Sequence, residues 1–332
     1  MADLTTKYLG LALRNPIIAG SSGLTDSVDN ILELERAGAG AVVLKSLFEE
    51  QILMEAESSL REAYENDMIY SAKSESLDYI DLHIKEDTLG RYIKLIGDAK
   101  SKTVIPVIAS INCVSSIEWT SFARRIEEAG ADALELNIAL LPSDMSVDNE
   151  KMENIYFEIV SKIIQQVNIP VALKIGSYFT NLAGMVNRLS ETGIKGLVLF
   201  NRFYSPDFDI NTLTEKSANT LSNPAEASNV LRWIAIMSGK VNCDLCANSG
   251  IHDGHSAIKQ LLAGASAIQI VSTLYKNGLG RLNEITDELA KWMDSKGYNN
   301  IQQFRGMMSQ DESKNPSAYE RIQFMKYFSE IR

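Results

Sequence analysis

The chain has 332 residues, of which 45% are hydrophobic and 23% are charged, as in ordinary folded globular proteins. The 32 basic and 43 acidic residues give a formal net charge of −11 without a basic patch, which disfavours nucleic acid and anionic lipid as partners. No apolar run approaches the roughly 20 residues of a membrane helix, and the first ten residues lack a signal-peptide core. We therefore expect a cytoplasmic protein with no membrane partner.

Three cysteines, Cys113, Cys243 and Cys246, are too few for a disulfide framework, which fits a reducing compartment. Cys243 and Cys246 have the C-x-x-C spacing of some metal sites, but no second pair accompanies them. We expect two packed, unreactive thiols there and no metal site.

The first 15 residues are expected to form a small hairpin around Gly10, at the floor of the domain that follows. Eight short apolar runs then recur along the chain, and a helical pattern follows each. Nearly continuous apolar runs are typical of strands that are buried on both faces in a parallel sheet. The runs are residues 16–19, 41–44, 105–111, 133–138, 170–175, 196–200, 243–247 and 267–271.

The segments between these runs carry helix start and stop signals. For example, a helix predicted over residues 27–37 ends at Gly38, and one over 253–262 ends at Gly264. Eight strands with helical crossovers predict a (β/α)8 barrel, a TIM barrel, as a single domain over residues 1–332. The alternative, an open doubly wound sheet, would need a G-x-G-x-x-G turn after its first strand, and the chain has none there.

Two segments interrupt the alternation of strands and helices. Residues 45–103 are too long for a simple crossover, and they begin at the carboxyl end of a strand, where barrels carry their active sites. We expect residues 46–87 to be an active-site lid or insertion, with a charged, solvated helix as the alternative. Residues 298–332 form a polar C-terminal extension.

Polar side chains gather where the predicted strands end, on the catalytic side of such a barrel. They include neither a carboxylate pair nor a histidine cluster, which disfavours a glycosidase and a catalytic zinc site. Glu135, two residues before Asn137 on the same strand face, either reaches the pocket or pairs with a lysine inside the barrel. The strand-end residues are Gly20, Ser21, Gly23, Lys45, Asn112, Cys113, Asn137, Lys174, Asn201, Ser249, Gly250, Ser272 and Thr273.

The last two predicted strands end in Ser249-Gly250 and Ser272-Thr273, each ahead of a helical turn. Glycine lets backbone N–H groups approach an anion, small hydroxyls add donors, and barrels commonly bind phosphate at these two strand ends. An ordinary tight turn is the alternative for either segment alone. Two adjacent turns of this kind favour a phosphate site.

Lys45 and Lys174 follow apolar strand residues and would direct two cations to one mouth. A lysine beside a flavin stabilises the negative charge of the reduced ring. Alternatively, Lys174 forms a Schiff base in a phosphate-binding lyase. The amides of Asn112, Asn137 and Asn201 suit a flat, heteroatom-rich ligand and favour the flavin.

A series of motifs along nearly the whole chain, taken in their order of occurrence, resembles the dihydroorotate dehydrogenase family of FMN-dependent barrels. The resemblance implies an FMN oxidoreductase that acts on a CH–CH bond of a planar, dihydroorotate-like substrate in pyrimidine biosynthesis, and a homodimer. The motifs are Arg14-Asn15-Pro16, Leu44-Lys45-Ser46, Glu135-Leu136-Asn137, Leu173-Lys174-Ile175, Phe200-Asn201, Ser249-Gly250-Ile251, Leu262-Ala263-Gly264-Ala265, Ile268-Gln269-Ile270 and Ser272-Thr273.

The resemblance also implies a role for each site residue. Asn137 and Asn201 would bind the substrate, and Lys45 would lie against both flavin and substrate. The flavin would be held by Gly20, Ser21, Gly23, Lys45, Asn112, Asn137 and Lys174, and its phosphate by Ser249, Gly250, Ser272 and Thr273.

One segment departs from the family pattern. Shortly after the strand asparagine, the family carries a Cys or Ser that acts as the catalytic base, and here Leu140 occupies that position. A leucine cannot take a proton, so Ser143 and Cys113 are the alternative bases. The departure leaves open a flavin-binding barrel with altered or lost catalysis.

Overall fold

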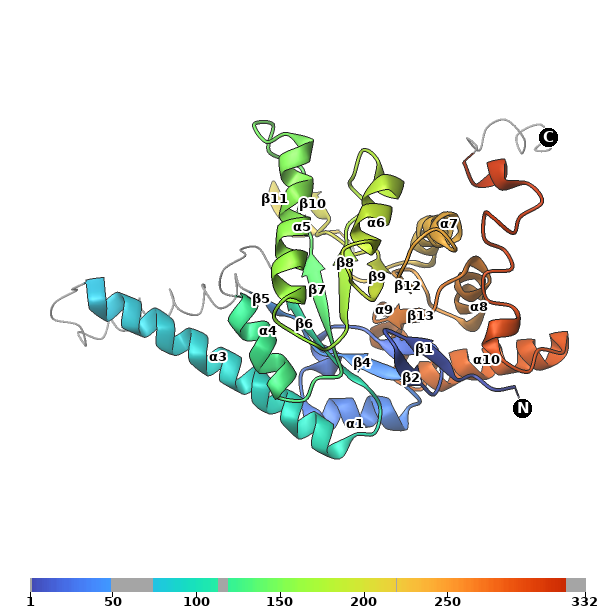
Figure 1. The fold of residues 1–332 in the computed structure, drawn as a ribbon, viewed down its shortest axis with the longest axis horizontal. Coiled ribbons are helices and arrows are strands. Elements are labelled where there is room, and N and C mark those ends of the chain that lie inside the picture. The colour runs from blue at the N-terminus through green and yellow to red at the C-terminus, as the bar shows by residue number, and fades with distance from the viewer. Residues whose placement is uncertain (1, 49–73, 113–118, 219, 321–332) are drawn as a thin grey trace.

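The computed structural model describes residues 2–48, 74–112, 119–218 and 220–320 (Figure 1). Most of the predicted lid, residues 46–87, and the candidate base Cys113 lie outside these ranges, so both stay predictions. Within the described ranges, no helix has the length and apolar character needed to cross a membrane.

The eight predicted strands are all present and close into a parallel barrel. They are β3 (Ile17–Ala19), β4 (Ala41–Val43), β6 (Val107–Asn112), β7 (Ala133–Ile138), β8 (Val171–Ile175), β9 (Gly196–Leu199), β12 (Asp244–Asn248) and β13 (Ala267–Ile270). Their order around the sheet is β4-β3-β13-β12-β9-β8-β7-β6, and a pairing between β4 and β6 closes the ring. A short strand, β5 (Leu47–Phe48), follows β4 along the chain and pairs with the carboxyl end of β6.

Helices surround the strands, as expected for a (β/α)8 barrel (Figure 1). The predicted stop at Gly264 is confirmed, because Gly264 ends the helix Gly254–Ala263 with a left-handed φ of 119°, and the side chain of Asp253 caps its start by accepting a hydrogen bond from Ser256 N. The α-helices are α1 (Val28–Arg36), α3 (Ser74–Lys102), α4 (Trp119–Glu128), α5 (Asn149–Ile164), α6 (Leu182–Ser190), α7 (Ala227–Met237), α8 (Gly254–Ala263), α9 (Ser272–Asn277) and α10 (Arg281–Lys296). The 3₁₀ turns are η1 (Gly23–Thr25), η2 (Pro224–Glu226), η3 (Ile301–Gln303) and η4 (Pro316–Tyr319).

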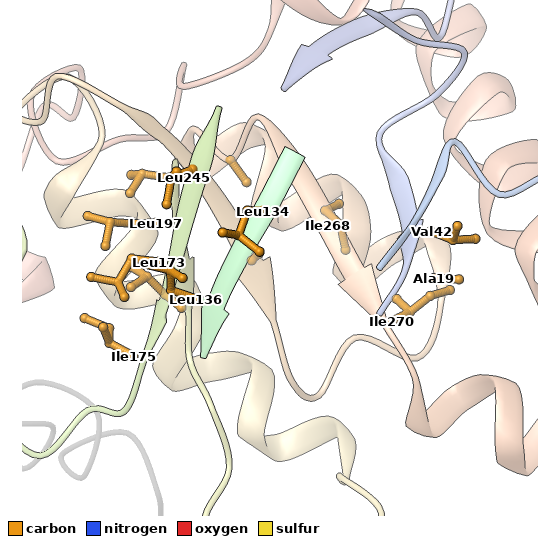
Figure 2. Close-up of a cluster of buried hydrophobic side chains, with 14 of the residues drawn as sticks. Ala19, Val42, Leu134, Leu136, Leu173, Ile175, Leu197, Leu245, Ile268 and Ile270 are labelled. Atoms are coloured by element: carbon orange, nitrogen blue, oxygen red, sulfur yellow. The ribbon is translucent and has the colours of Figure 1, made fainter. Parts of the chain in front are cut away.

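The core has two layers because successive residues of a strand point to opposite faces of the sheet. One set of strand side chains packs in the same buried cluster as the surrounding helices, and Figure 2 shows several of them, including Leu134, Leu173 and Ile268. The alternate set forms a second cluster inside the barrel, which includes Ile108, Ala133, Ala172, Val198, Cys246 and Ala267.

The N-terminal hairpin covers the floor of the barrel, as predicted. It consists of β1 (Thr6–Tyr8) and β2 (Leu11–Leu13), paired antiparallel. Tyr8, Leu9 and Leu13 belong to the cluster inside the barrel. The approach is close at Gly196, where an added Cβ would lie 2.5 Å from a methyl carbon of Leu9. The hairpin therefore completes the core inside the barrel.

Sequence patterning missed a second hairpin between β9 and α7. Its strands, β10 (Pro206–Asp209) and β11 (Thr214–Ser217), pair antiparallel and are almost wholly exposed. A strand pair without a buried face carries no apolar alternation, so the pattern that revealed the barrel strands is absent here.

The C-terminal extension is anchored by aromatic packing. Phe304 is fully buried, and its ring lies edge-to-face against Trp292 of α10, with centroids 4.9 Å apart. Tyr298 packs against the same two rings. This part of the extension therefore belongs to the domain core.

The two cysteines of the C-x-x-C segment are free thiols, as predicted. Cys246 is fully buried inside the barrel, and burial raises the pKa of its thiol. Burial, followed by the charge of Asp244, raises the pKa of Cys243 to about 12. Both side chains stay protonated and unreactive near neutral pH.

We expect Leu13→Ala to lower the free energy of unfolding by about 2–5 kcal/mol, because it opens a cavity between the hairpin and the barrel interior. Leu11→Ala in the same strand should cost much less, since Leu11 is only half-buried. Urea unfolding monitored by circular dichroism gives both values. Equal losses for the two variants would show that the hairpin does not pack into the barrel as described.

Candidate functional site

Inside the barrel, an apolar layer gives way to a polar layer toward the carboxyl ends of the strands. Successive interior positions of a strand are two residues apart. On five strands, a polar side chain occupies the interior position that follows an apolar one. These polar residues are Ser110, Glu135, Lys174, Asn248 and Gln269, and each is at least nine-tenths buried. The sequence pattern thus builds a polar mouth on an apolar floor.

Lys174 and Glu135, from the neighbouring strands β8 and β7, meet Gln269 of β13 across the barrel interior. Lys174 Nζ lies 3.9 Å from Glu135 Oε1 and 3.5 Å from Gln269 Oε1. Gln269 Nε2 donates a 2.5 Å hydrogen bond to Glu135 Oε2. The expectation that Glu135 pairs with a lysine inside the barrel is therefore confirmed, and the charge of Lys174 is compensated by a buried carboxylate.

A cavity of about 250 Å³ opens above this group. Six residues expected from the sequence line it, contributed by the carboxyl ends of five different strands. They are Ser21, Lys174, Asn201, Ser249, Gly250 and Ser272, and Gln269 and Tyr275 also face the same space. Residues from distant parts of the chain thus share one pocket with a cation at its inner end.

Small residues and donors form the far side of this cavity. Ser249 and Gly250 have positive φ values of 82° and 75°, and an added Cβ on Gly250 would lie 2.2 Å from Ala227 N. Only glycine fits that turn. Ser222, which the sequence did not single out, crosses the same place: its backbone N–H donates to Ser272 Oγ at 2.8 Å, and its hydroxyl accepts from Gly250 N at 3.3 Å.

Two basic side chains stand beside Ser222. Lys276 Nζ donates to the carbonyl of Ser222 at 2.7 Å, and His252 Nε2 lies 3.1 Å from the Ser222 hydroxyl. Burial, followed by the charge of Lys276, lowers the pKa of His252. The backbone donors, hydroxyls and nearby cation make this end of the cavity suited to an anion.

The strand-end asparagines form a second polar group. Asn201 Nδ2 donates to Asn137 Oδ1 at 2.7 Å, and Asn112 pairs in register with Asn137 on the adjacent strand. Asn137 is nine-tenths buried, whereas Asn112 and Asn201 are half-buried. The two groups assigned to substrate from the sequence are therefore in direct contact.

Asn112, Asn137 and four more of the expected residues, Gly20, Gly23, Lys45 and Thr273, are not among those that line the cavity. The backbone N–H of Gly20 donates to Ile270 O at 3.0 Å, and an added Cβ on Gly23 would meet the hydroxyl of Tyr275 at 3.0 Å. Lys45 is exposed, with its backbone N–H donating to Thr25 O. Thr273 is fully buried and donates its hydroxyl to His252 O, so its side chain supports the turn.

In the loop after β7, neither Leu140, at the family's base position, nor the candidate base Ser143 lines the cavity. Leu140 is half-buried and lines a separate cleft of about 370 Å³ together with Tyr156 and Tyr178. Ser143 is exposed, and its backbone N–H donates to Leu141 O at 2.8 Å. Neither residue is placed as a side-chain base at the pocket that Lys174 lines.

Comparison with known proteins agrees with this arrangement. The family model described as dihydroorotate dehydrogenase matches residues 3–293. The chain belongs to the dihydroorotate dehydrogenase family. Its members are FMN-dependent oxidoreductases that act on a CH–CH bond, and this chain is an FMN oxidoreductase of that kind.

Individual relatives match at low identity over almost their whole length. The catalytic subunit of dihydroorotate dehydrogenase B (NAD(+)) from Thermoplasma volcanium is 27% identical over 316 residues, which cover 92% of this chain and 99% of the relative. The subunit of the same name from Pyrococcus abyssi is 26% identical over 92% of this chain and 98% of the relative. Dihydroorotate dehydrogenase (fumarate) from Lachancea kluyveri is 24% identical over 93% and 99%.

The residues at the mouth fit FMN. A buried cation, Lys174, faces the cavity and suits the pyrimidine edge of a flavin, where negative charge collects on reduction. The opposite end offers the Ser249-Gly250 turn and Ser272, which suit a phosphate. Gln269 and Ser222 also belong to this site, although neither was assigned to it from the sequence. Strand alternation would have placed Gln269 inside the barrel, whereas no local pattern marked Ser222.

We expect Ser272→Asp to weaken FMN binding by roughly 100-fold or more, because a carboxylate would face the phosphate across a partly desolvated pocket. Ser272→Asn, which has nearly the same shape without the charge, should stay within about tenfold of the wild type. An acidic residue at the start of α9 is compatible with the helix dipole, so stability should be retained. Quenching of flavin fluorescence on titration measures the affinities, and equal effects of both variants would place the phosphate elsewhere.

Proposed function

We propose that this chain oxidises a CH–CH bond in a dihydroorotate-like ring, with FMN bound at the mouth of the barrel, as a step of pyrimidine biosynthesis. The observation that carries the proposal is the single cavity that joins Lys174 to the Ser249, Gly250 and Ser272 end. The two ends of the cavity match the two ends of FMN. One end carries a cation that suits the flavin ring, and the other is an anion site that suits the phosphate.

Bound FMN would supply the acceptor for the hydride that leaves the substrate carbon. Lys174 then provides positive charge where negative charge develops, and its fixed position means that no reorganisation is needed at that moment. Asn201 holds Asn137 through its amide, so Asn137 can present its own Nδ2 group to a ring carbonyl. Together these side chains bind and orient a planar, heteroatom-rich substrate.

The Schiff-base alternative for Lys174 gains no support from the comparisons. The names of the relatives describe oxidoreductases. Lys174 also lies beside the buried carboxylate of Glu135, which favours the charged ammonium over the neutral amine that a Schiff base requires.

We expect Lys174→Met to lower the two-electron potential of bound FMN by at least about 30 mV, which corresponds to tenfold weaker binding of reduced relative to oxidised FMN. The binding of oxidised FMN should change less, because the added charge appears only on reduction. Spectroelectrochemical titration of the holoprotein measures the potential. Loss of FMN with an unchanged potential in the remaining holoprotein would mean that the lysine only positions the cofactor.

A second candidate function rests on the loop after β7. Leu140 has no proton acceptor, Ser143 is exposed, and a positioned base contributes about 10²–10⁴-fold to such reactions. We propose that turnover of dihydroorotate itself is slow, because neither residue is placed to take a proton from a substrate in the cavity.

Leu140→Cys should raise turnover of dihydroorotate with a dye acceptor by far less than the roughly 100-fold that a positioned base contributes, because residue 140 lines a cleft separate from the cavity. Leu140→Ala gives the same loosening of the loop without an acceptor and should not raise it. Ser143→Ala should match the wild type. Rapid wild-type turnover, or a rate lost in Ser143→Ala at full FMN occupancy, would contradict the second candidate.

We also propose a cytoplasmic location and a homodimer. The free thiols of Cys243 and Cys246 support the first, because a reducing compartment keeps such thiols reduced. The second rests on family resemblance, and light scattering of the purified holoprotein tests it through a mass of twice 36.7 kDa.

A further inference from the structure

Glu135 is a buried carboxylate directly beneath the site. It is 1% exposed and does not line the cavity, so it cannot touch a ligand there. Its Oε2 atom accepts from Gln269 Nε2, while its Oε1 atom has no hydrogen-bond partner among the described residues and faces Lys174 Nζ at 3.9 Å. One carboxylate oxygen is therefore held by the amide of Gln269, and the other faces the ammonium group of Lys174.

Within the described part of the chain, three further titratable groups that interact with Glu135 are neutral acids. Tyr8 from β1, Tyr92 from α3 and Cys246 from β12 each have a raised pKa, with burial as the main cause and the charge of Glu135 as a further one. These groups stay protonated and uncharged, so they cannot compensate a carboxylate. Lys174 is the cation that faces it. A buried charge is strongly disfavoured without an opposite partner, so each member of the pair favours the charged form of the other.

We propose that Glu135 is a positioning residue that keeps Lys174 protonated while the cofactor is oxidised, so that the positive charge is in place before electrons arrive. The inference rests on the proposed function, in which Lys174 lies beside the flavin. Lysine buried without a partner has a lowered pKa and tends to lose its proton. Glu135 prevents this, and Gln269 fixes the carboxylate from the other side.

The pairing of Lys174 with Glu135 determines how many protons accompany reduction. In the wild type, two electrons and one proton enter the cofactor, and Lys174 keeps the proton that it already holds. With Gln at position 135, Lys174 is neutral beside the oxidised cofactor and takes one further proton from solvent when negative charge appears. Each additional proton steepens the pH dependence of a two-electron potential by about 30 mV per pH unit.

The test is the midpoint potential of FMN in Glu135→Gln holoprotein, measured with mediator dyes across neutral to mildly alkaline pH. We expect its slope against pH to be about twice that of the wild type, since two protons rather than one are taken up. Glu135→Asp keeps a carboxylate and should restore the wild-type slope. Gln269→Leu removes the hydrogen bond but keeps both charges, so its slope should also stay that of the wild type. A wild-type slope in fully loaded Glu135→Gln would overturn the inference.

A second measurement does not depend on Glu135→Gln being stable. In Lys174→Met the carboxylate loses its cation, so Glu135 should become protonated and show the infrared carbonyl band of a carboxylic acid. The band should be missing in the wild type and in Lys174→Met/Glu135→Gln. Its absence from Lys174→Met would overturn the pairing. The potential separates the two proposals: an unchanged potential in Lys174→Met with the band present would refute the stabilisation of reduced FMN by Lys174 and leave the pairing intact.

Discussion

The alternation of side chains along eight closed strands governs this molecule. In a closed parallel barrel every second residue must enter the interior, so each strand contributes to a stack of interior layers. Here the lower layer, with Ala133 and Cys246, is apolar and is completed by Leu9 and Leu13 from the hairpin. The next layer is polar, with Glu135 and four further buried polar side chains. The floor supplies hydrophobic stabilisation, and the mouth supplies chemistry.

A polar layer inside a barrel has an energetic cost unless its charges and donors are satisfied. The contact among Lys174, Glu135 and Gln269 meets that requirement, because a cation and a carboxylate on the neighbouring strands β8 and β7 are joined to an amide on β13, which pairs with neither strand. A buried ion pair is weak evidence for stability, since desolvation offsets much of the attraction. Its value here is functional: it holds one positive charge at the inner end of the cavity in a fixed place.

Much of the fold was predictable because barrel strands are buried on both faces and the helices between them carry local caps. The hairpin β10–β11 was missed because exposed strands leave no apolar pattern, and β5 because two residues are too few for one. Among the site residues, strand ends such as Asn201 and Ser249 were identified by position. Ser222 was missed because its role depends on a loop that returns over Gly250, a contact between residues 28 apart in sequence.

Whether a residue takes part in the site depends more on its surroundings in the structure than on its residue type. Glu135 and Ser143 are both plausible chemical groups in the sequence, yet one is fully buried against Lys174 and the other is exposed on a loop. Leu140 lines a separate cleft with Tyr156, whereas strand-end residues such as Lys174 and Ser249 line the cavity. Such differences arise from three-dimensional packing, which spacing along the chain does not encode.

The cofactor content of the freshly purified protein provides the most decisive measurement, because every part of the site described above is organised around FMN. The protein should show the visible absorption of a flavin and release one FMN per chain on heat denaturation. If it purifies without cofactor, added FMN should bind one-to-one with quenching of its fluorescence. A colourless, folded protein that leaves the fluorescence of added FMN unchanged would contradict the assignment of the barrel mouth as a flavin site.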